Sequence, residues 1–150
     1  MAILGGVMYR KLHFFACFIV LALLAGVAGV PQVHAVSYVV FASSPDNAGV
    51  NGDCSLREAI QAAQTNAPYD TCPAGSNVDT DTIILESGKT YTLTMLGSND
   101  ESNAFGDLDF NTNGGALLDI EITTDGDEPA TIAQLTPNQR IFDISVNISL

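Results

Sequence analysis

The sequence predicts a mainly β chain in which short strands form a solenoid behind one short helix. From Asp81 onward, short runs of β-branched and apolar residues alternate with turns rich in Gly, Asp and Asn. Apolar residues alternate within these runs, so each strand turns one face toward a core. Similar strands recur about every 24 residues, a spacing typical of one repeat of a solenoid.

The expected strands fall into two interleaved series, and we expect the strands within each series to stack in parallel. The first series comprises 82–85, 107–110 and 131–135, and the second comprises 91–94, 118–121 and 142–145. An antiparallel sandwich also contains many short strands with regular turns, and the spacing alone leaves that alternative open.

Residues 1–35 have the features of a cleaved secretory signal peptide. Two basic residues precede an almost wholly apolar run over 12–30, Pro31 breaks that run, and Val33-His34-Ala35 is suited to signal peptidase. The apolar run is long enough to cross a bilayer, so an uncleaved anchor is the alternative. We expect export to the cell surface or the medium.

Removal of this leader leaves a strongly acidic chain without histidine. Arg57, Lys89 and Arg140 remain against 17 acidic residues, which gives a net charge of −14. Such a chain is poorly suited to nucleic acid or to anionic membranes, so we expect neither as a partner. It also lacks a Ser-His-Asp triad, a Cys-His pair and any histidine-containing zinc motif, so we expect no enzyme activity here.

The residue types within 36–80 indicate a strand over 36–42, a polar loop over 43–53 and then a capped helix that ends near Thr65. Ser55 and Glu58 have the spacing of a capping box. The positions that share one apolar stripe of the helix are Leu56, Ala59, Ile60 and Ala63. We expect Arg57 and Glu58 on the opposite, outer face.

Two cysteines, Cys54 and Cys72, remain in the exported chain. In an oxidising compartment we expect them to form a disulfide, and two free thiols are the alternative. The bridge would hold the following loop against the start of the helix. On the chain-entropy model it would stabilise the fold by about 3 kcal/mol.

A candidate calcium site begins where one expected strand meets its turn, and calcium is the only cofactor that the sequence suggests. The oxygen-bearing residues are Asp107, Asp109, Asn111 and Asn113, and the last three have the spacing of the first half of an EF-hand loop. The second half of the EF-hand pattern is absent, because Ile120 occupies the position of the bidentate glutamate. Asn and Asp also simply favour turns. The pair Asp107 and Asp109 could instead serve as acid and base in glycoside hydrolysis.

The block Cys54-Ser55-Leu56-Arg57-Glu58-Ala59-Ile60 resembles the signature of the CSLREA-type N-terminal domain of secreted bacterial proteins with right-handed parallel β-helices. Looser similarity covers 81–85, 90–94, 106–110 and 140–144. The chain departs from the family in having no cysteine within 46–53 and in the turn at 86–89. The resemblance implies a right-handed parallel β-helix in preference to a sandwich.

Together these features predict a cap over 36–80 and the first coils of a β-helix over 81–150. The helix would cover one end of the core, while 146–150 stop within a strand, so we expect a truncated coil with an open edge. The expected function is a non-enzymatic capping segment of a secreted or cell-surface β-helix protein, used in adhesion or in glycan or surface binding. The alternative is the N-terminal part of a polysaccharide lyase or glycoside hydrolase whose active site lies downstream.

Overall fold

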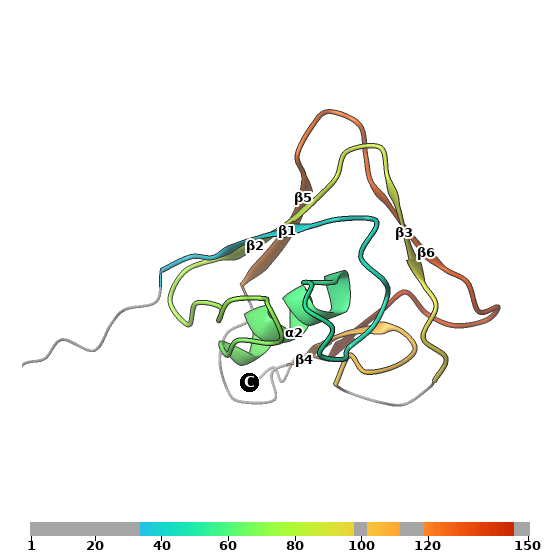
Figure 1. Cartoon of the computed structure of the whole chain (residues 1–150), viewed down its shortest axis with the longest axis horizontal. Coiled ribbons are helices and arrows are strands. Elements are labelled where there is room, and N and C mark those ends of the chain that lie inside the picture. Colours follow the sequence, from blue (N-terminus) through green and yellow to red (C-terminus); the bar gives the residue numbers. More distant parts are fainter. Residues whose placement is uncertain (1–33, 98–101, 112–118, 146–150) are drawn as a thin grey trace, which may run out of the picture. The chain divides into compact units, whose positions relative to one another are not determined.

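Seven short strands and one helix form the part of the chain that the structure, a computed structural model, describes: residues 34–97, 102–111 and 119–145. In chain order they are β1 Ser37–Val40, α2 Leu56–Thr65, β2 Asp81–Leu85, β3 Thr90–Leu93, β4 Leu108–Asn111, β5 Ile120–Thr124, β6 Thr131–Gln134 and β7 Phe142–Ser145 (Figure 1). All belong to one compact unit, Val33–Leu150. Nearly all of the expected signal peptide, Asn113 and the expected last strand at 146–150 lie outside the described residues.

The strands form three parallel sheets, ordered β1-β2-β5, β3-β6 and β4-β7. Consecutive strands from β2 onward lie in different sheets, and the chain visits the three sheets twice in the same order. Every strand pair among the described residues is parallel, so the antiparallel sandwich is excluded for this part of the chain. The prediction of a mainly β chain with parallel strands is confirmed.

The predicted pairing of the strands was wrong. Asp81 pairs with Ile120, Thr90 with Thr131 and Leu108 with Phe142, so the chain returns to the same sheet after 34 to 41 residues, not 24. The three members of each predicted series lie on three different sheets. Alternation and turn residues mark where a strand is, but they do not reveal how many strands complete one circuit of the core.

The core lies between the sheets and under α2. Inward residues of the first circuit are buried, among them Ile83, Leu85, Leu93 and Leu108. The predicted apolar stripe of α2 joins the same cluster, and the helix contacts β1, β2 and β4. Figure 1 shows α2 between these strands. The helix thus packs onto the core of the first circuit.

The placement of Arg57 and Glu58 on the outer face of the helix was wrong. Both side chains are 0% exposed. The loop between β1 and α2 folds back over this side of the helix, since Asp46 pairs with Arg57 and the carbonyl of Asn47 accepts a hydrogen bond from Ser55. The helix therefore has two covered faces, which an amphipathic pattern does not reveal.

Candidate functional site

The first turn of α2 is fixed by the capping box that the sequence suggests. Glu58 Oε2 accepts a hydrogen bond from the Ser55 amide at 2.8 Å, and Ser55 Oγ accepts one from the Glu58 amide at 3.3 Å. The same hydroxyl donates to the carbonyl of Asn47 at 2.8 Å. At the other end, Asn66 adopts the left-handed conformation (φ 52°) that terminates helices. Ser55 thus joins the helix start to the preceding loop.

A disulfide between Cys54 and Cys72 joins the same turn to the loop that follows the helix, as predicted. That loop is itself closed by a backbone pair, in which Tyr69 and Cys72 exchange hydrogen bonds of 3.1 and 2.9 Å. Tyr69 also donates its hydroxyl to the carbonyl of Ala48 at 2.7 Å. The loops before and after α2 are therefore held to each other as well as to the helix.

Arg57 connects the helix to two distant parts of the chain. Its Nε pairs with Asp46 Oδ1, and Nη2 lies 3.5 Å from Asp46 Oδ2. Nη1 donates to the carbonyl of Asp107 at 2.9 Å, and Nη2 donates to the carbonyl of Gly106. These two carbonyls immediately precede β4. A buried guanidinium that is both paired and hydrogen-bonded fixes geometry through its several donors.

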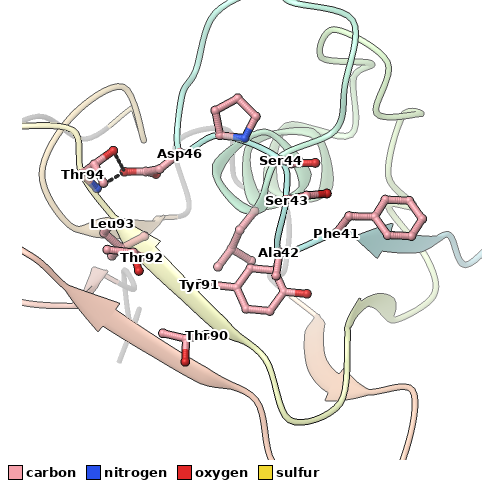
Figure 2. A pocket seen from close by; sticks show the side chains of 12 residues that line it. Phe41, Ala42, Ser43, Ser44, Asp46, Thr90, Tyr91, Thr92, Leu93 and Thr94 are labelled. Carbon is pink, nitrogen blue, oxygen red and sulfur yellow. Dashed lines mark hydrogen bonds between the residues drawn. The ribbon is translucent and has the colours of Figure 1, made fainter.

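Asp46 completes this connection on its other side. Its Oδ2 accepts a hydrogen bond from the amide of Thr94, just after β3 (Figure 2). It also accepts one from the amide of the next residue, Met95, at 2.9 Å. One carboxylate thus joins the loop after β1, the helix and the end of β3. Sequence reasoning missed Asp46 and Arg57 as partners. The available signal was that Arg57 is the only basic residue in a helix that follows an acidic loop.

Asp81 fastens the start of β2 in a similar way. It is buried, and its carboxylate accepts hydrogen bonds from the amide of Ser76 at 2.9 and 3.0 Å and from the amide of Val36 at 3.1 Å. Burial raises the pKa of Asp81 above its usual range; these hydrogen bonds oppose the rise, and the charges of Asp119 and Asp79 add to it. Asp81 thus ties the start of β2 to the loop before it and to the residue before β1.

A hollow of about 380 Å³ lies between the loop after β1 and strand β3. Figure 2 shows Phe41 near one end of it and Asp46 with Thr94 near the other. Its lining consists of Phe41, Ala42, Ser43, Ser44, Pro45, Asp46, Leu56 and 90–94. The Phe41 side chain is 54% exposed, whereas Tyr91 is buried and donates its hydroxyl to the carbonyl of Val40 at 2.7 Å. The hollow therefore combines one available aromatic ring with several hydroxyls.

The carboxylates predicted to bind calcium are partly brought together. Asp107 and Asp109 lie near each other, with Asp143 of β7 as their third neighbour. Arg140 already pairs with two of them, from Nε to Asp107 at 3.0 Å and from Nη1 to Asp143 at 2.7 Å. Asn111 is buried, and its amide donates to Gln64 Oε1 at 3.4 Å. The sequence did not suggest Asp143 or Arg140 as neighbours of this site.

No family model, curated protein or solved structure matches this chain. Within the described ranges, no helix has both the length and the apolar character needed to cross a bilayer.

Proposed function

We propose that residues 36–145 are a non-enzymatic N-terminal cap and the first coils of a right-handed parallel β-helix of the CSLREA type, in a secreted or cell-surface protein. The observation that supports this proposal is the difference between the two ends of the stacked sheets. One end is covered by α2 and its tethered loops, and at the other end none of the described residues forms a comparable cover.

The end covered by α2 has several features that close this side of the core. Among the described strands, β2 has neighbours on both sides, whereas β3 and β4 each have one, β6 and β7. On the remaining side of the core lie α2, the disulfide and the Arg57–Asp46 pair. A solenoid needs such a cover, because its terminal repeat otherwise exposes apolar surface and unpaired strand groups. The disulfide also suits an exported protein.

The opposite end carries exposed apolar side chains. Phe142 and Ile144 of β7 are 41% and 68% exposed, while their partners on β4 are less exposed: Leu108 is buried and Phe110 is partly buried. Strands β5, β6 and β7 are edge strands of their sheets. We infer that this end receives the next coil of the same solenoid, which would cover these residues and pair with these edges.

The two ends can be compared by placing one lysine at each. Ile144→Lys at the open end should leave the melting temperature nearly unchanged and should reduce self-association of the chain in sedimentation velocity, because charge discourages edge pairing. Val39→Lys on β1, at the capped end, is the matched control and should leave self-association unchanged. Equal self-association of Ile144→Lys and wild type would remove the claim of an open edge.

For the adhesive role, the hollow beside β3 is the candidate contact with a glycan. Ligand sites are typically concave and combine aromatic surface with a few polar groups, and Phe41 and the hydroxyls of Ser43 and Thr92 supply both. The net charge of −14 without the expected leader favours neutral over acidic glycans. An enzyme whose active site lies downstream remains the alternative function.

Phe41→Ala should abolish binding to neutral glycans on an array, because it removes the exposed ring from the hollow. Val50→Ala, which shortens another highly exposed apolar side chain outside the hollow, is the control and should bind as the wild type does. Retained binding by Phe41→Ala would exclude the hollow as the glycan contact.

A further inference from the structure

Three carboxylates from different segments meet beside the disulfide. Asp53 precedes Cys54, Asp70 lies two residues before Cys72, and Glu58 belongs to the first turn of α2. One carboxylate oxygen from each lies within 4.8 Å of the other two. The disulfide joins the two loops that carry Asp53 and Asp70.

Two oxygens of this cluster are buried without a hydrogen-bond donor. Glu58 Oε2 accepts from the Ser55 amide, but Glu58 Oε1 has no partner although the side chain is fully buried. Asp53 Oδ1 is likewise buried and without a hydrogen bond. Asp70 Oδ2 accepts from the amides of Asn51 and Gly52 at 2.8 and 2.7 Å. Buried acceptors left without a donor are costly and need an explanation.

The cluster also lacks a positive charge. None of the ion pairs among the described residues involves Asp53, Glu58 or Asp70; Arg57 pairs with Asp46, and Arg140 with Asp107 and Asp143. Burial raises the pKa of Glu58, the hydrogen bonds with Ser55 oppose the rise, and the charges of Asp53 and Asp70 add to it. Either a bound cation or a retained proton can offset the burial and mutual repulsion of these carboxylates.

We propose that Asp53, Glu58 and Asp70 bind a calcium ion that fastens the start of α2 to the loops on either side of it. The ligand set is all oxygen and strongly anionic, which suits a hard divalent cation. The nearby cysteines are in a disulfide and cannot act as thiolate ligands. The carboxylates come from two loops and a helix, and calcium tolerates such irregular geometry better than magnesium does. Asp53 and Asp70 are only partly buried, so water can complete the shell.

Terbium(III) luminescence and thermal unfolding of the disulfide-intact full chain test this site. Tyr69, next to Asp70, can sensitise bound terbium, so excitation of tyrosine should produce terbium emission that calcium displaces. Millimolar calcium should raise the melting temperature by about 5 °C, while magnesium should have a much smaller effect.

Glu58→Gln is the decisive variant, because glutamine can still accept from the Ser55 amide and keep the capping box. It should weaken terbium and calcium binding roughly tenfold or more, through loss of one anionic ligand. Asp53→Asn should do the same. Asp127→Asn, which removes one exposed charge, should leave binding unchanged.

Three outcomes would overturn the proposal. The first is an unchanged melting temperature in calcium together with wild-type stability that increases from neutral to mildly acidic pH, which would mean that the cluster holds a proton. The second is full calcium binding by Glu58→Gln. The third is loss of calcium binding only in Asp107→Asn, which would place the ion at the other acidic cluster.

Discussion

At the scale of single residues, Arg57 has the most demanding environment in the described part of the chain. It is a fully buried cation with one carboxylate partner, Asp46, and two backbone carbonyl partners. Removing one member of a buried ion pair leaves the other charge buried and uncompensated, which is far more costly than losing a pair at the surface. The stability of the cap should therefore depend strongly on this residue.

Arg57→Met, which keeps the length of the side chain but not the charge, should lower the free energy of unfolding by about 3–5 kcal/mol in urea denaturation. Arg140→Met is the comparison; its partner Asp107 is buried, but this arginine is itself 60% exposed and water reaches the pair, so its loss should cost clearly less than the loss of Arg57.

The same experiment extends to a double-mutant cycle. Asp46→Asn combined with Arg57→Met should recover part of the loss, because no buried charge is then left alone. Equal effects of Arg57→Met and Arg140→Met would contradict the structural role assigned to Arg57.

At the scale of elements, local chemistry was largely predictable from the sequence. The capping box, the apolar stripe and the end of the helix near Thr65 all follow from the order of residues around Ser55. The disulfide followed from there being two cysteines in the chain without its expected leader. The capping box, the apolar stripe and the helix end depend on residues that are close in sequence. The disulfide was predictable because two cysteines allow only one pairing.

Features that depend on distant contacts could not be predicted in the same way. Arg57 and Glu58 were expected to face solvent, because the hydrophobic pattern of a helix identifies only its most apolar face and does not show whether another face is also buried. Their burial depends on how the loop with Asp46 folds back and on where the carbonyls before β4 come to lie. The cluster of Asp53, Glu58 and Asp70 likewise forms only once the disulfide loop has closed.

At the scale of the whole described unit, the two ends of the stacked sheets are chemically different. At one end, α2 packs against β1, β2 and β4, while at the other the apolar residues of β7 are exposed to solvent. The number of strands in one circuit was not evident from the sequence, because successive strands resemble one another whichever sheet they join. In the solenoid that we propose, each coil contacts only its neighbours, so stability should decrease from the covered end toward the open one.

Native-state hydrogen exchange of the backbone amides tests the central claim, that α2 closes one end of an otherwise open coil, most directly. We predict that amides of α2 and β2 exchange only through global unfolding, and that those of β6 and β7 exchange about 100-fold faster through local opening at the bare end. Protection of β7 equal to that of β2, or early exchange of α2 as an independent unit, would contradict it.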